Sequence, residues 1–228
     1  EIENFFSNLK QCNFNLINEI IFINDCSTDN SLDLLQKKIN EFKSLFSNIN
    51  FLIISNFKNR GYGFSIKKGV YNSKNDYIAI IDLDRTYKIE DLNNISHEFI
   101  NPQQLQYDLI IGQRKIDPTN TSRLKIIGKT IINMITNFCF NEKIIDYNSG
   151  LRVFNKKKFI KHSHMMSDRF SLTTSMTITF LNENNLAKIN PMKTIKILPS
   201  VNKSDILSPV MNIERINTVE IIKNEYIK

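Results

Sequence analysis

Asp-Tyr-Ile-Ala-Ile-Ile-Asp-Leu-Asp-Arg-Thr-Tyr, residues 76–87, is the stretch that decides the fold. Its apolar run, Tyr77–Ile81, is typical of a strand buried on both faces of a parallel sheet. The run ends in Asp82 and Asp84, whose side chains would point to the same side of a continuing strand. Two such carboxylates repel each other unless a cation lies between them, and Mg²⁺ or Mn²⁺ is the usual cation. Two solvated aspartates before a helix that begins near Glu90 would explain this stretch equally well.

The composition is that of a globular protein with a basic surface. The 228 residues are 41% hydrophobic and 23% charged, enough for one large domain or two small ones. The net charge of +7 favours an anionic partner: a nucleotide, a phospholipid surface or nucleic acid. Nucleic acid is the least favoured, because no aromatic residues are interleaved with basic ones, and we expect none to bind.

Segments that would locate the protein in the cell are not evident. No apolar segment approaches the ~20 residues that span a bilayer, and no signal peptide is present. Three cysteines, Cys12, Cys26 and Cys139, argue against a disulfide framework and predict buried free thiols in a reducing compartment. The chain starts at Glu1, without a methionine and inside a helical pattern, so we expect a fragment of a longer protein.

Strands and helices are predicted to alternate along the first half of the chain. This pattern indicates βαβ units and a largely parallel sheet, whose ligands bind at the carboxyl ends of the strands. Asp25, Asp84 and Arg114 each lie just past the end of an expected strand, so together they favour a phosphate-bearing ligand. The expected strands cover residues 19–23, 51–55, 77–81 and 107–112, and expected helices cover 2–9, 32–42 and 90–100. A glycine turn over residues 59–64 is expected to open a further helix that runs to about residue 72.

In the second half of the sequence the strands and helices no longer alternate regularly. Helices are expected over residues 123–140 and 170–181, and a strand over 189–197, with Pro191 at a sheet edge. The tail from Pro199 to Lys228 is weakly patterned. Because we find no linker, no repeat and no second core, we expect a single domain over residues 1–228.

The order of motifs resembles the family 2 glycosyltransferases of the GT-A fold, an α/β fold with a Rossmann-like, mostly parallel sheet flanked by helices. The nearest branch resembles the dolichyl- and undecaprenyl-phosphate sugar transferases. The first strand of that fold, with its Pro-x-Tyr-Asn-Glu motif, is expected to be missing, and Glu1 stands where its glutamate would be. The matching motifs are Glu19–Asp29, Asn59–Gly63 with Gly69, Asp76–Asp84, Ile111–Arg114, Asp146–Arg152, Phe170–Phe180 and Pro191–Ile206.

The resemblance implies a donor half up to about residue 115, an acceptor half after it, and a metal-dependent, inverting sugar transfer in cell-surface polysaccharide synthesis. Asp82, Asp84 and Thr86 would hold Mg²⁺ or Mn²⁺, and Arg114 would meet a phosphate of the donor or of the acceptor. The donor would be a nucleoside-diphosphate sugar and the acceptor a polyprenyl phosphate or a glycan. The residues implied to bind the donor are Glu1, Ile23, Asp25, Asp82, Leu83, Asp84 and Lys203.

Several residues depart from the family pattern. Asn24 replaces an aspartate, and Cys26 replaces a glycine, which matters only if that position needs a positive φ. Ser200 and Asp205 stand where the family carries basic residues, and the loss of a charge-assisted phosphate contact costs roughly 1.5–3 kcal/mol. This favours an alternative function, a weak or inactive nucleotide-sugar-binding partner subunit.

Two further hypotheses concern the acceptor and the membrane. Transfer to a glycan hydroxyl would need a carboxylate base, and Asp146 is the candidate, whereas a phosphate acceptor needs none. Ser175 stands where many relatives carry an acidic residue, which also favours a phosphate acceptor. The basic run Lys156–Lys158 with Lys161, beside Phe154, Phe159 and Ile160, would either touch the cytoplasmic face of a membrane or form a solvated turn.

Overall fold

The computed structural model describes residues 2–11, 16–82, 89–100, 107–114, 146–186, 195–201 and 216–222, with the single positions 128, 130, 131, 134 and 138. The helices in these ranges are α1 (Ile2–Gln11), α2 (Ser31–Lys43), α3 (Tyr62–Asn72), α4 (Ile89–Ile100), α6 (Lys156–His162) and α7 (Leu172–Leu186), with a 3₁₀ turn at Ser163–Met165. The strands are β1 (Ile17–Asn24), β2 (Asn50–Ser55), β3 (Tyr77–Asp82), β4 (Leu109–Arg114), β5 (Arg152–Asn155), β6 (Ile195–Val201) and β7 (Ile216–Ile222).

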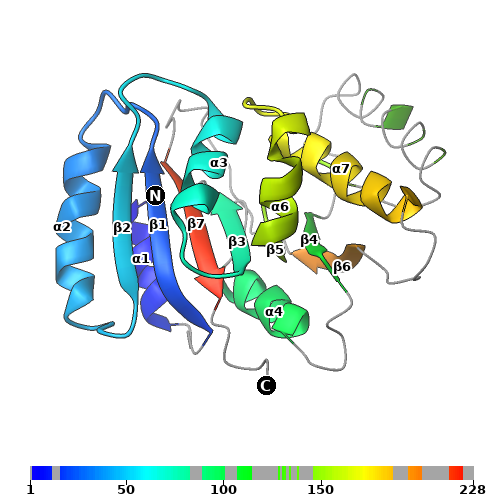
Figure 1. Ribbon diagram of the computed structural model, residues 1–228. Helices are drawn as coiled ribbons and strands as arrows, with labels where there is room; N and C mark the ends of the chain where they lie inside the picture. Colours follow the sequence, from blue (N-terminus) through cyan, green and yellow to red (C-terminus); the bar gives the residue numbers. More distant parts are fainter. Residues whose placement is uncertain are drawn as a thin grey trace.

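One seven-stranded sheet runs through both halves of the chain, in the order β2-β1-β7-β3-β5-β4-β6 (Figure 1). β5 and β7 run antiparallel to their neighbours, whereas the other five strands share one direction. The shared direction of these five strands agrees with the predicted parallel sheet, but only two of the six strand pairs, β1 with β2 and β4 with β6, are parallel. The central strand β3, which was expected in a parallel sheet, pairs on both sides with antiparallel strands.

Alternating side chains of the strands build a core on each face of the sheet. Ile20 and Phe22 pack on one face with α1, α2 and α4, and Ile21 and Ile23 pack on the other with α3, α6 and α7. Figure 1 shows α1 behind the sheet and α3 and α6 in front of it. Because both faces are covered, β1 and β3 each contain a continuous apolar run, Ile20–Ile23 and Ile78–Ile81, which is why the sequence identified these strands.

The expected helices and strands of the first half are confirmed to within one or two residues at most ends. In the second half, α7 begins two residues later than expected. The strand expected over residues 189–197 is described only from Ile195, as the edge strand β6, and residues 189–194, with Pro191, lie outside the described residues. Among the described strands β6 pairs with β4 alone, and this edge position tolerates its Pro199. β7, in the tail, was not predicted: it lies between β1 and β3, in the middle of the sheet. The helix expected over residues 123–140 lies mostly outside the described residues, although its five described positions are helical.

Candidate active site

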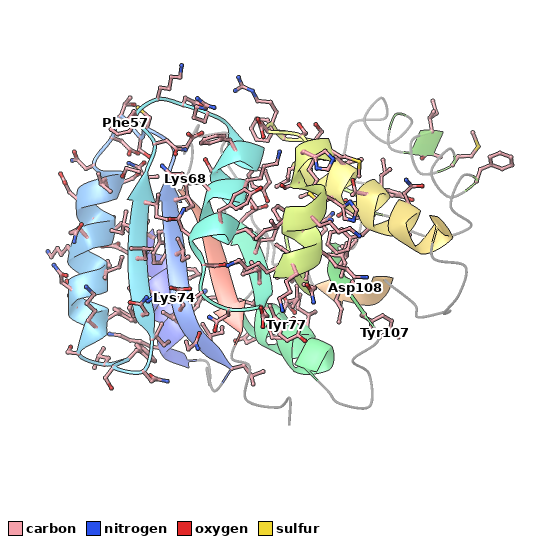
Figure 2. All side chains as sticks on the ribbon, viewed as in Figure 1. Phe57, Lys68, Lys74, Tyr77, Tyr107 and Asp108 are labelled. Carbon is pink, nitrogen blue, oxygen red and sulfur yellow. The ribbon has the colours of Figure 1, made fainter. Side chains whose placement is uncertain are left out.

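The shared strand direction brings the carboxyl ends of β1, β2, β3 and β4 to one edge of the sheet. In Figure 2, Phe57, which follows β2, lies at the upper edge of the molecule. Lys74 and Tyr77, at the amino end of β3, and Asp108, before β4, lie toward the lower edge. The upper edge is the edge at which the sequence predicted the ligand.

Asp25 lies just past the end of β1 and is buried, with 1% of its surface exposed. Its carboxylate accepts hydrogen bonds from the Asn56 amide (2.8 Å) and from the backbone N–H groups of Arg60 (2.8 Å) and Gly61 (2.7 Å). Asp25 therefore holds the glycine turn before α3. Its predicted contact with the nucleoside stays a prediction.

The glycine turn itself needs its glycines. Gly61 has a φ of +95°, in the region that side chains avoid. A Cβ added to Gly63 would lie 2.3 Å from the Ser167 carbonyl oxygen, so α3 could not approach the segment before α7 with any other residue there. The Phe64 N–H completes this contact by donating to the Asp168 carbonyl (2.9 Å).

Lys67 of α3 also contacts the segment before α7. Its ammonium donates to the Met166 carbonyl (2.6 Å) and to the Asp168 carboxylate (2.7 Å). Sequence analysis missed this pair, because about a hundred residues separate the partners and no local pattern links them. The ion pair between Lys67 and Asp168 joins the expected donor half of the chain to the expected acceptor half.

Asp82 ends β3 and is half-buried. Its carboxylate lies directly against Gly150: a Cβ added to that glycine would be 2.0 Å from Oδ2 of Asp82. One of the two predicted metal-binding aspartates is therefore held between the end of a buried strand and a glycine of a distant loop. The sequence identified both stretches but not their contact.

The loop from Asp146 to Leu151 is tied to the end of β4. The Ser149 hydroxyl donates to the Gly112 carbonyl, and the Gly112 N–H donates to the Leu151 carbonyl (3.0 Å). Asp146 is completely buried at the start of this loop. The hypothesis that Asp146 is the base for an acceptor hydroxyl stays a prediction.

Of the remaining predicted site residues, only Ile23 and the backbone of Arg114 are described. Ile23 is completely buried and packs in the core with Ile66 and Val70, and its predicted contact with the donor stays a prediction. Arg114 ends β4, and only its backbone is described, opposite Val201 of β6. The other predicted site residues lie outside the described residues: Glu1, Leu83, Asp84, Thr86 and Lys203.

The departures from the family pattern have structural consequences. Asn24 keeps a hydrogen-bonding role, since its side-chain oxygen accepts from the Ser27 N–H (3.0 Å). Cys26 has a φ of +63°, so this position does favour the glycine that it replaces. Cys26 is also exposed, which corrects the prediction of a buried thiol; the other two cysteines lie outside the described residues. The Ser175 hydroxyl accepts from the Ser167 N–H (3.0 Å) and so holds the segment before α7.

Comparison with protein families and curated proteins gives two matches. A model of the family described as "Glycosyl transferase family 2" matches residues 2–163. The chain is also similar to the glycosyltransferase AglJ of Haloferax volcanii, with 29% identity over 121 residues. That match covers 52% of this chain and 38% of AglJ.

Three solved structures share the fold. TarS residues 1–349 of S. aureus gives a TM-score of 0.55 at 15% identity, covering 88% of this chain and 55% of that one. The mannosyltransferase PcManGT of Pyrobaculum calidifontis, in complex with GDP-Man and Mn²⁺, gives 0.53 at 10% identity, covering 88% and 51%. Glucosyl-3-phosphoglycerate synthase of Mycobacterium tuberculosis, in complex with UDP, gives 0.50 at 11% identity, covering 83% and 61%.

These identities establish the fold alone, and it is the GT-A fold that the sequence predicted. The chain spans less than two thirds of each of these relatives, from 38% of AglJ to 61% of the synthase chain.

Proposed function

Because this chain belongs to glycosyl transferase family 2, we propose that it transfers a sugar from a nucleoside diphosphate to a polyprenyl phosphate, using Mg²⁺ or Mn²⁺ and inverting the anomeric carbon. The contact between the Asp82 carboxylate and Gly150 carries this proposal. It fixes an acidic group at the carboxyl edge of the sheet, where α/β folds bind nucleotides. Two structural neighbours were solved with GDP-Man and Mn²⁺ or with UDP, which supports a donor of this class.

The residues at this edge suit a metal that is shared with a diphosphate. Mg²⁺ is commonly held by one or two carboxylates together with substrate phosphates, and Asp82 with Asp84 would provide the carboxylates. Within the described ranges no three acidic, histidine or cysteine side chains gather into a metal site. When bound, the ion would stabilise the negative charge that develops on the leaving diphosphate.

The proposed reaction is one displacement at the anomeric carbon. An oxygen of the acceptor phosphate forms the new bond to this carbon, while the bond from the carbon to the β-phosphate oxygen of the donor breaks and its electron pair leaves with the nucleoside diphosphate. The acceptor phosphate is already anionic, so no side chain has to remove a proton. This fits the complete burial of Asp146 and the use of Ser175 as a backbone partner.

The proposed membrane contact does not involve the basic run of α6. Phe154 and Phe159 are completely buried, and the Lys158 ammonium is paired with Asp108 near the opposite edge of the sheet (Figure 2). This arrangement favours a solvated surface for these lysines, which lie on a helix and not in the expected turn. No described helix is both long and apolar enough to cross a bilayer.

The described helical positions 128, 130, 131, 134 and 138 offer a better candidate for the contact. Ile131, Met134 and Phe138 recur at helical spacing and are 47%, 64% and 89% exposed. An apolar stripe of this kind on a basic chain is typical of a helix that lies on a membrane surface. We therefore propose that the protein works on the cytoplasmic face of a membrane, with these three side chains in the lipid.

A sedimentation assay with anionic vesicles tests the membrane contact. The double variant Met134→Gln, Phe138→Gln should lose most of its vesicle binding. The control Phe57→Gln replaces an even more exposed aromatic side chain outside this helix and should bind like the wild type. Equal binding by all three proteins would contradict the assignment of this stripe.

A transfer assay tests the proposed activity. Radiolabelled UDP-, GDP- and TDP-sugars are offered with undecaprenyl phosphate in detergent, with a free oligosaccharide in parallel, with and without Mn²⁺. The proposal predicts metal-dependent label in the lipid with one class of donor. Label in the oligosaccharide instead would contradict the acceptor. Donor binding without transfer to either acceptor would favour the alternative of an inactive partner subunit. The presence of Ser200 and Asp205, where the family carries basic residues, supports that alternative.

A further inference from the structure

Arg152 is the largest completely buried side chain among the described residues. It begins β5, and its backbone lies between Ile80 of β3 and Ile111 of β4. A buried guanidinium must have its donors satisfied, because an unpaired buried charge is strongly unfavourable. The proposed activity gives this residue no direct part.

The guanidinium of Arg152 is satisfied by one loop and one helix. Nε donates to the Ser149 carbonyl (2.7 Å), and Nη2 donates to the Tyr147 carbonyl (2.6 Å). Nη1 donates to the Thr177 hydroxyl of α7 (2.7 Å). The Thr177 hydroxyl in turn donates to the Thr173 carbonyl (2.9 Å), so its own orientation is fixed.

These bonds fold the loop from Asp146 to Leu151 around the Arg152 side chain. Two of its carbonyls point inward to the guanidinium, and Gly150, the residue after Ser149, comes to lie on the Asp82 carboxylate. The chain of contacts thus runs from Thr177 through Arg152 and the loop to the acidic group at the end of β3.

We propose that Arg152 is a positioning residue for the donor site: it shapes the loop so that Gly150 fixes the orientation of the Asp82 carboxylate. This inference rests on the proposed function, since it assumes that Asp82 binds the metal and the diphosphate. Arg152 acts through the loop and does not touch the donor. A buried ion is seldom kept for stability alone, because apolar replacements are often as stable or more so. Groups that orient a metal ligand from behind commonly change metal affinity about 10- to 100-fold when they are removed.

Variants of Thr177 test this with the least disturbance. Thr177→Val keeps the shape of the side chain but removes the acceptor for Nη1, and Thr177→Ser keeps that acceptor. Phe154→Leu is the matched control, because Phe154 is also completely buried, two residues further along the same face of β5. The affinity for Mn²⁺ is measured by electron paramagnetic resonance in the presence of a saturating nucleoside diphosphate, and the melting temperature is measured for each variant.

We expect Thr177→Val to weaken Mn²⁺ binding about tenfold and Thr177→Ser to restore it. Phe154→Leu should lower the melting temperature without changing the affinity for Mn²⁺. Equal Mn²⁺ affinities for the wild type and Thr177→Val would overturn the inference and leave the proposed function intact. So would a loss of affinity in Phe154→Leu that follows its loss of stability. A wild-type protein that binds no Mn²⁺ with any nucleotide would overturn both.

Discussion

Alanine at position 150 would add one methyl group at the point where the Asp82 carboxylate lies. The new Cβ would be 2.0 Å from Oδ2 and 2.6 Å from the carboxylate carbon, whereas ordinary contact begins at 3.4 Å. The oxygen must therefore move by about 1.4 Å. Gly150 is not among the described glycines with a positive φ, so alanine is compatible with the backbone conformation at this position. The side chain of Asp82 therefore has to move.

A displacement of this size is large for a metal ligand. A misplacement of about 1 Å can reduce catalysis about 100-fold, and disturbing the support of a metal ligand commonly lowers metal affinity about 10- to 100-fold. We expect Gly150→Ala to bind a nucleoside diphosphate with Mn²⁺ at least tenfold more weakly than the wild type. Stability should change little, because the group that moves is the end of one half-buried side chain.

Isothermal titration with nucleotide in the presence of Mn²⁺ measures the affinity, and thermal unfolding measures the stability. Gly128→Ala is the matched control, since no atom lies within 4 Å of the added Cβ and this helical position should gain about 1 kcal/mol from alanine. Wild-type affinity in a folded Gly150→Ala protein would refute the reasoning. A Gly150→Ala protein that does not fold would refute it as well, because the carboxylate would then not be the group that yields.

Three further predictions concern stability and its dependence on pH. Gly63→Ala places Cβ 2.3 Å from a backbone oxygen, which cannot rotate away, and should cost about 1–3 kcal/mol in urea unfolding; an unchanged midpoint would be inconsistent with the contact between α3 and residue 167. Cys26→Gly should stabilise the chain by about 0.5 kcal/mol because glycine relieves the strain at φ +63°, while Cys26→Ala, which keeps that strain, should not. Hydrogen bonds from Ser31 lower the pKa of Asp29 below its usual 3.8, so the stabilisation from this carboxylate is present above pH 3.8 and is lost as the pH falls through the lower folded pKa. Asp29→Asn should remove this part of the acid sensitivity of unfolding, and an unchanged acid profile would count against the prediction.

Local features of the sequence were sufficient to predict most elements that lie near the ligand edge. The apolar run of β3 identified a buried strand, and the two glycines at the start of α3 identified a tight turn that opens a helix. Both signals are local, because burial on two faces and close backbone approach each restrict the residue types at single positions.

The features that were missed depend on contacts between distant parts of the chain. β7 reads Ile-Asn-Thr-Val-Glu-Ile-Ile and lacks the continuous apolar run expected of a central strand, and its partners lie more than a hundred residues earlier. The burial of Arg152 could not be predicted either, since an arginine in a turn-rich stretch is usually solvated. The hydrogen-bond acceptors for its guanidinium come from α7 and from the loop before β5, which only the folded chain brings together.

The most direct test of the donor site compares two aspartates at opposite ends of β3. Asp82 ends the strand at the proposed donor site, and Asp76, also half-buried, precedes the same strand at the far edge. Nucleotide binding is titrated with and without Mn²⁺ on the wild type, Asp82→Asn and Asp76→Asn. We predict Mn²⁺-dependent binding that is lost in Asp82→Asn and kept in Asp76→Asn. Binding that is independent of Mn²⁺, or equal in all three proteins, would contradict a donor site built on Asp82.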